Sequence, residues 1–201
     1  MQKFLQNLTR AKSSCRFLQT GMLLLVMLAN MVSHAVAADK ALSEYKLKAA
    51  LLYKLTHFVE WPATASSPKP NRFNICLLGR DDFGSALDSL STRKVNGIPI
   101  AISRFSYSTG IDKQCQLLFI SDSKQAFLSS IIQTLGKQPV LTISDARDFV
   151  EQGGMIQFVS EKKRIGFRIN LRKARAANLK IAAPLLELAT IISTRKNQDT
   201  P

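Results

Sequence analysis

Histidine, cysteine and tryptophan are scarce in this chain of 201 residues, which contains two, three and one of them, respectively. His34 lies within the first 37 residues, and the other histidine, His57, stands alone in the sequence. A zinc site, or a nucleophile activated by a neighbouring imidazole, is therefore not expected. The Gly-x-Ser-x-Gly turn that exposes the serine of many hydrolases is also missing. We predict that the protein is not an enzyme and holds no metal or cofactor.

Positions 1–37 lack acidic residues, and they also lack an apolar run long enough to span a membrane. The apolar segment at 21–32 has 12 residues, whereas a spanning helix needs about 20. Four cations precede it, and Ala35-Val36-Ala37 supplies the small residues of a cleavage site. This pattern predicts a signal peptide, residues 1–37, cleaved between Ala37 and Ala38, with an uncleaved membrane anchor as the alternative. The mature protein is expected outside the cytoplasm.

No segment rich in proline, glycine and serine divides residues 38–201, so we predict a single domain there. The chain has 28 basic and 14 acidic residues. Residues 1–37 contain four of the basic and none of the acidic ones, which leaves 24 against 14, or a net charge of +10, for the remainder. Because export removes most nucleic acid from reach, we expect an acidic protein surface or an anionic envelope polymer as the partner. The alternative is a solvated basic surface without a partner.

Two cysteines, Cys76 and Cys115, remain after the predicted cleavage. An even number of cysteines in an oxidising compartment usually forms disulfides. Closing a loop of about 40 residues would stabilise the domain by about 4 kcal/mol on the chain-entropy model. We predict a disulfide between these two residues.

Hydrophobic periodicity predicts an α/β fold. A helix is predicted over Glu44–Trp61, with Leu47, Leu51, Leu55 and Phe58 on its buried stripe. Strands are predicted at 73–78, 98–102, 116–121 and 139–144, with helical segments at 82–90, 122–135 and 145–151. Runs at 155–159 and 164–169 flank a polar turn and predict a hairpin, and a last helical region begins at Asn170. These elements predict a single compact domain with a mostly parallel sheet, flanking helices and an added antiparallel hairpin.

Polar residues follow three of the predicted strands: Arg80 and Asp82 the first, Asp122 the third and Asp145 the fourth. The carboxyl ends of parallel strands meet at one edge of a sheet, where ligands commonly bind. Arg80, together with helix N-terminal amides, could hold a small anion in such a crevice. The alternative is that the three aspartates only cap helices.

Basic residues are concentrated between Lys162 and Lys180, and no acidic residue occurs between Lys162 and Leu186. Such a surface would attract an acidic partner in a salt-dependent manner. We predict that the partner-binding residues are Arg164, Arg168, Arg172, Lys173 and Arg175. A solvated face without a partner is again the alternative.

Several segments resemble motifs of the YfiR family. Residues 48–62, KAALLYKLTHFVEWP, resemble its opening helix motif, residues 73–84, FNICLLGRDDFG, its first strand and turn, and residues 115–121, CQLLFIS, its cysteine-bearing strand. Further matches follow in the family order at 139–145, 153–159, 165–170 and 177–186. The resemblance covers about residues 44–192, and the order of its seven motifs makes it specific.

This resemblance implies a periplasmic regulator without catalysis. The best-known member of the family binds the periplasmic sensory part of an inner-membrane diguanylate cyclase and holds it inactive, which keeps cyclic-di-GMP low and restrains biofilm formation. An outer-membrane lipoprotein can sequester that repressor. Other relatives are fused to sensor kinases, so a small-ligand sensory module acting with a sensor kinase is the alternative.

The resemblance also bears on sites and partners. The family disulfide falls on Cys76 and Cys115, whereas a second cysteine pair found in some relatives is absent from this sequence. Expected partners are the periplasmic domain of a membrane cyclase or kinase and an outer-membrane lipoprotein, but not nucleic acid. A homodimer is left open.

Overall fold

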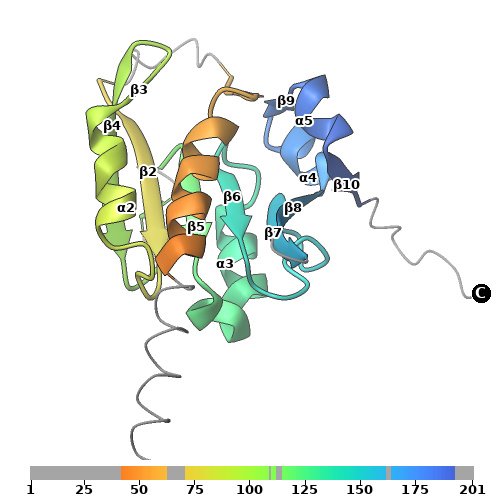
Figure 1. Cartoon of the computed structure of the whole chain (residues 1–201). Helices are drawn as coiled ribbons and strands as arrows, with labels where there is room; N and C mark the ends of the chain where they lie inside the picture. The colour runs from red at the N-terminus through yellow and green to blue at the C-terminus, as the bar shows by residue number, and fades with distance from the viewer. Residues whose placement is uncertain (1–41, 63–70, 109, 112–114, 162–163, 193–201) are drawn as a thin grey trace, which may run out of the picture. The chain divides into compact units, whose positions relative to one another are not determined.

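The computed structural model describes residues 42–62, 71–108, 110–111, 115–161 and 164–192 (Figure 1). The predicted signal peptide lies outside the described residues. Residues from Tyr45 onward form one structural unit, which is described below. Within the described ranges, no helix has both the length and the apolar character that crossing a membrane requires.

Eight described strands form one sheet, in the order β10-β8-β7-β6-β5-β2-β4-β3. Their bounds are β2 Phe73–Leu78, β3 Lys94–Val95, β4 Ile98–Phe105, β5 Leu117–Ile120, β6 Leu141–Ser144, β7 Ile156–Glu161, β8 Arg164–Ile169 and β10 Ala189–Ile191. Strands β4, β2, β5, β6 and β7 are parallel neighbours, β8 is antiparallel to β7, and β10 is parallel to β8. The short β3 is antiparallel to β4. The predicted mostly parallel sheet with an added hairpin is thereby confirmed.

Helices cover both faces of this sheet. The N-terminal helix (residues 42–55, orange in Figure 1) lies on one face, and α3 (Leu128–Leu135) lies on the other. The remaining helical segments are α2 Ser85–Asp88, α4 Leu171–Ala176 and α5 Ala183–Glu187, with 3₁₀ turns η1 Ser89–Thr92 and η3 Asp122–Phe127. A separate two-stranded antiparallel sheet pairs β1 (Val59–Glu60) with β9 (Lys180–Ile181).

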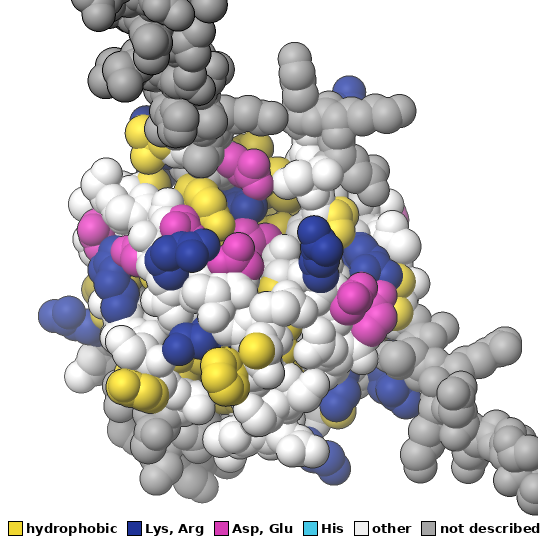
Figure 2. Space-filling view, turned by 90° about the horizontal axis from the view of Figure 1, so that it is seen from below, with side chains coloured by type: hydrophobic (Ala, Val, Ile, Leu, Met, Phe, Trp, Pro, Cys, Tyr) yellow, Lys and Arg dark blue, Asp and Glu magenta, His cyan; other side chains and the backbone are white. Residues whose placement is uncertain are grey.

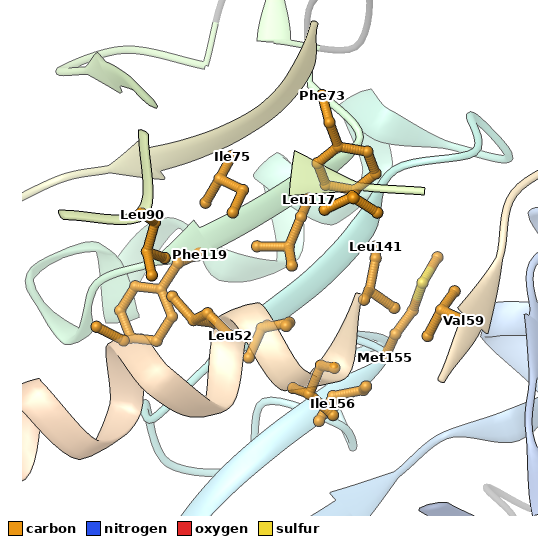
Figure 3. Close-up of a cluster of buried hydrophobic side chains, with 14 of the residues drawn as sticks. Leu52, Val59, Phe73, Ile75, Leu90, Leu117, Phe119, Leu141, Met155 and Ile156 are labelled. Atoms are coloured by element: carbon orange, nitrogen blue, oxygen red, sulfur yellow. The ribbon is translucent and has the colours of Figure 1, made fainter. Parts of the chain in front are cut away.

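The alternation of side chains along each strand produces two cores. On the face of the N-terminal helix, Leu52 is fully buried among side chains of strands β2, β5, β6 and β7 (Figure 3). On the face of α3, Ile131 and Leu135 pack with Leu118 and Ile120 of β5. The central strands are therefore buried on both sides, as is typical of parallel sheets.

The disulfide between Cys76 and Cys115 is present, with a Cα–Cα distance of 5.9 Å. Cys76 lies within β2, and Cys115 comes two residues before β5. Both residues are buried, at 0 % and 4 % exposure. The bond therefore joins two neighbouring strands inside the core on the α3 side.

The N-terminal helix is shorter than predicted. It ends at residue 55, and the chain then turns into β1 instead of continuing to Trp61. The Thr56 hydroxyl donates to the Tyr53 carbonyl oxygen at 2.7 Å, and Val59 pairs with Ile181 of β9. These interactions use backbone positions that a longer helix would occupy.

The buried stripe of this helix also differs from the prediction. Leu55 is buried as expected, but Leu47 is 47 % exposed. Ala49 and Leu52 occupy the buried face instead. Residues spaced four apart shift progressively around the helix axis, so the predicted series that begins at Leu47 runs from the exposed face to the buried face.

The second half of the chain contains two further departures. The segment 145–151, predicted as a short helix, forms turns in which Asp148 has φ 52°, in the left-handed region that helices exclude. The region after Asn170 is not one helical region but α4, β9, α5 and β10 in succession. Asn170 does cap α4, because its Oδ1 accepts from the backbone N–H of Lys173 at 3.1 Å.

Candidate functional site

Three of the four residues predicted to line the crevice form one ion-paired group at the carboxyl ends of β2 and β5. Arg80 Nε lies 3.0 Å from Asp82 Oδ1, and Arg80 Nη2 lies 3.0 Å from Asp122 Oδ1. The hydrogen bond and charge of Asp82, followed by the charge of Asp122, raise the pKa of Arg80. The guanidinium thus bridges the loops after the two strands, and an added anion would have to compete with both carboxylates.

Asp145, at the carboxyl end of β6, belongs to a different and buried group. Its Oδ2 accepts from Lys48 Nζ at 2.6 Å and from the Tyr45 hydroxyl at 3.2 Å. The Lys48 and Asp145 side chains are only 5 % and 12 % exposed. The Lys48 ammonium also lies 4.3 Å from the centroid of the Tyr45 ring. Both partners come from the N-terminal helix, so this ion pair joins the helix to the end of the sheet.

The environment of Tyr45 keeps its hydroxyl protonated, so that it remains a hydrogen-bond donor. Burial, and then the negative charge of Asp145, raise the pKa of Tyr45 above its usual value. The other carboxylate oxygen of Asp145, Oδ1, is buried without a hydrogen-bond partner among the described residues. Sequence reasoning missed Tyr45 and Lys48, although a lysine beside Ala49 and Leu52 on an apolar face signals a buried partner.

A second exposed ion-paired group lies beside the first. Arg104 of β4 contacts Asp81 at 2.7 Å and Asp88 at 2.9 Å. Burial acts to raise the pKa of Asp81, but hydrogen bonds from Arg104 and from the backbone N–H groups of Gly84 and Phe83 outweigh it, so that this pKa is lowered. Asp81, rather than the predicted Asp82, therefore stabilises the turn that leads into α2.

Figure 2 shows the end of the molecule to which these strand ends point. Acidic and basic side chains are interleaved there rather than separated into patches of one sign. Of the four residues predicted to line the crevice, Arg80, Asp82 and Asp122 lie together, whereas Asp145 forms an ion pair with Lys48 below the surface. Because these charged side chains pair with one another, they connect the loops after β2 and β5 and hold the N-terminal helix to the end of β6.

The predicted partner-binding residues differ in exposure: four are exposed, and Arg168 is partly buried. Arg172, Lys173 and Arg175 are exposed on α4, and we call them the α4 basic surface. Arg164 is exposed at the start of β8. Arg168 is different, because its side chain is 28 % exposed, pairs with the Glu151 carboxylate and donates to Gln157 Oε1 at 3.3 Å.

A pocket of about 450 Å³ adjoins the α4 basic surface. It is lined by Glu60, Trp61 and Pro62 at the end of β1, and by Arg175, Asn178, Leu179 and Lys180. The indole of Trp61 is held in place, since its Nε1 donates to the Gln116 carbonyl oxygen at 3.0 Å and its ring packs edge-to-face on Phe73. The pocket therefore combines an aromatic wall with two cations and a carboxylate, and Lys180 Nζ lies 3.6 Å from Glu60 Oε2.

Metal chemistry has no candidate within the described residues, where no group of three or more His, Cys, Asp or Glu side chains could hold an ion. His57 is exposed, and its ring packs on Tyr53 with centroids 4.8 Å apart. The described sites are thus suited to binding through charge and aromatic surface.

Comparison with known protein families identifies a match. Residues 45–190 match the model of a protein family described as YfiR/HmsC-like. That family is regulatory and non-catalytic, and it indicates periplasmic regulation of cyclic-di-GMP signalling together with a membrane signalling protein. No curated protein sequence matches the chain.

Proposed function

Because this chain belongs to the YfiR/HmsC-like family, we propose that it binds the periplasmic sensory domain of an inner-membrane diguanylate cyclase and holds that enzyme inactive. Residues 1–37 direct export and are removed, and residues 38–201 form the active periplasmic domain. Repression lowers cyclic-di-GMP and restrains biofilm formation. The observation that carries the proposal is the family match over residues 45–190.

The α4 basic surface supports binding to an acidic protein face. Its three side chains are exposed, and the nearest described acidic residue after it in the sequence is Glu187. Exposed cations steer a partner of opposite charge and speed association more than they add to affinity. The contact would therefore weaken as ionic strength rises.

Repression needs no chemistry from this protein. A sensory domain with active and inactive arrangements shifts toward whichever arrangement the partner binds more tightly. A rigid α/β domain that binds only the inactive arrangement lowers cyclase output by mass action. An outer-membrane lipoprotein that binds the same surface would release the cyclase by competition.

The primary test measures intracellular cyclic-di-GMP in a deletion strain and its parent. The proposal expects a rise of severalfold on deletion, reversed by the exported protein but not by a version without residues 1–37. An unchanged level in the deletion strain would refute the proposal. Deletion of the cyclase gene should abolish the rise, which identifies the partner.

A charge-reversal pair tests the docking surface. Arg172→Glu with Arg175→Glu should weaken binding to the purified sensory domain at least tenfold. Lys94→Glu with Lys137→Glu changes the net charge equally at exposed positions away from α4, and it should leave the affinity within about twofold. Equal loss in both double variants would mean that net charge, not this surface, governs binding.

A second candidate function is small-ligand sensing with a sensor kinase, and the pocket beside Trp61 favours it. Its charged groups, Arg175 and the pair of Lys180 with Glu60, suit a zwitterionic metabolite, and the indole offers a stacking face. Thermal unfolding in the presence of a metabolite panel tests this candidate. A ligand-dependent rise in Tm that Arg175→Ala abolishes would support it, and no rise with any metabolite would remove it.

A further inference from the structure

The two edges of the eight-stranded sheet are protected to very different degrees. At one edge, β3 covers the start of β4, where Pro99 cannot donate a hydrogen bond, and Arg104 carries two ion pairs. Proline and charged side chains are the usual means of preventing an edge strand from pairing with another chain. At the other edge, β10 has the sequence Ala-Thr-Ile. β10 therefore carries neither proline nor charge, and its short length of three residues is the protection that it does have.

The outward side of β10 presents free backbone groups. Ile192 N–H donates to the Ile169 carbonyl oxygen of β8 at 2.8 Å. Because alternate residues of a parallel strand face the same neighbour, Thr190 and Ile192 face β8, whereas Ala189 and Ile191 face away from it. No described strand lies on that side of β10. The N–H and C=O groups of Ile191 are thus directed toward an open edge, whereas the N–H of Ala189 already donates to the Leu186 carbonyl oxygen at the end of α5.

Exposed apolar side chains accompany these backbone groups. Leu188, immediately before β10, is 74 % exposed, and Ile191 is 44 % exposed. An open backbone edge beside apolar side chains is what an added strand uses, with the backbone giving affinity and alternate side chains giving specificity.

The charge around this edge indicates what kind of strand it accepts. Ile192 bonds to Ile169 at the carboxyl end of β8, and α4 with the exposed Arg172 and Lys173 begins two residues later. The exposed Glu187 lies two residues before β10, so cations outnumber carboxylates among these neighbours. A second copy of this chain would bring an equally basic surface to the same place, which like-charge repulsion opposes. An extended segment that combines apolar with acidic side chains has complementary charge.

We propose that β10 is a docking edge to which the sensory domain of the membrane partner adds an extended, apolar and acidic segment. This inference rests on the proposed function and assigns it a binding mode. The added segment would pair with the backbone N–H and C=O of Ile191 and place its acidic side chains near the α4 basic surface. It would extend the sheet by a ninth strand.

The test variant is Ile191→Pro, with Ile191→Ala as the matched control. Proline removes only the N–H that faces away from β8 and leaves the bonds of Thr190 and Ile192 to β8. In a deletion strain, Ile191→Pro should lose repression, so that cyclic-di-GMP comes within about twofold of the deletion level. Ile191→Ala keeps this N–H and loses only the exposed apolar side chain, so cyclic-di-GMP should stay closer to the wild-type level than to the deletion level. Repression by Ile191→Pro at the wild-type level would overturn the proposal.

Hydrogen exchange on the unmodified protein keeps the proposal testable even where Ile191→Pro fails to fold. The amide of Ile191 should exchange rapidly in the free protein and become protected when the purified sensory domain is added. Protection in the free protein at low concentration would show that residues 193–201 cover the edge, and protection that grows with protein concentration would show a second copy. Either result overturns the proposal.

Failure of the proposed function gives a different result, because deletion would then leave cyclic-di-GMP unchanged. In that case inner-membrane vesicles from the deletion strain replace the sensory domain as the probe. Protection of the Ile191 amide by these vesicles supports an edge that binds another membrane partner, and its absence overturns the inference.

Discussion

The buried ion pair between Lys48 and Asp145 should control how firmly the N-terminal helix is held to the sheet. Replacing Lys48 by Met keeps an unbranched side chain of similar length but leaves the Asp145 carboxylate with Tyr45 as its only described donor. Because both side chains are at least 88 % buried, as their exposures of 5 % and 12 % show, the loss resembles breaking a buried pair. Such a loss costs about 3–5 kcal/mol.

Removing both charges should recover most of this loss. In Lys48→Met/Asp145→Asn neither side chain is ionised, so the free energy of unfolding should return to within about 1–2 kcal/mol of the wild type. The exposed pair of Lys180 and Glu60, 3.6 Å apart and 82 % and 77 % exposed, provides a matched control. Lys180→Met should change stability by less than about 1 kcal/mol.

Urea unfolding followed by Trp61 fluorescence and by circular dichroism measures all four proteins. A cost below about 1 kcal/mol for Lys48→Met, comparable to that of an exposed pair, would refute a stabilising role of the buried ion pair. A double variant as unstable as Lys48→Met would also refute it, because the loss would then come from the packing of the lysine stem and not from the unpaired charge.

Two further predictions concern the disulfide and the effect of acid. Replacing Cys76 and Cys115 by Ala, or reducing the wild type, should lower the free energy of unfolding by about 2–4 kcal/mol, because it releases the loop between two cysteines that are 39 residues apart in sequence. The amount of protein in the periplasm should also fall. An unchanged urea midpoint would contradict this prediction. Although burial acts to raise it, the pKa of Asp81 is lowered by hydrogen bonds from Arg104, Gly84 and Phe83. Its contribution is therefore complete above the unfolded pKa of about 4 and is lost as pH falls through the lower folded value. The stability advantage of wild type over Asp81→Asn should stay constant above about pH 5 and shrink as pH falls below about 4, and a difference that is the same at all these pH values would refute this.

The central strands could be predicted from sequence because each is a short apolar run bounded by polar turns. Residues 73–78 become β2 with the bounds predicted, and the strands predicted at 116–121 and 139–144 contain β5 and β6. Burial on both faces removes any need for alternation, so the run itself is the signal. The hairpin of β7 and β8 was equally clear because a polar turn separates two apolar runs.

Elements that depend on distant partners could not be predicted. Val59 and Glu60 form a strand only because Lys180 and Ile181 lie beside them, and local periodicity continues the helix through those positions. Likewise, residues 189–191 have an apolar pattern that fits a helix as well as a strand, and pairing with β8 decides the outcome. Short elements gain little from local propensity, so their tertiary contacts determine them.

The same distinction applies to the sites. Sequence position was enough to place Arg80, Asp82 and Asp122 at one edge, because parallel strands end together. It could not show that Arg80 forms ion pairs with both Asp82 and Asp122, or that Asp145 bonds to Lys48, 97 residues away in sequence. Nor could it place β10 last in the order of the described strands, because that order depends on the pairing of β10 with β8. A charge pattern read from the sequence therefore indicates the kind of partner, whereas the surface available to that partner is a property of strand order.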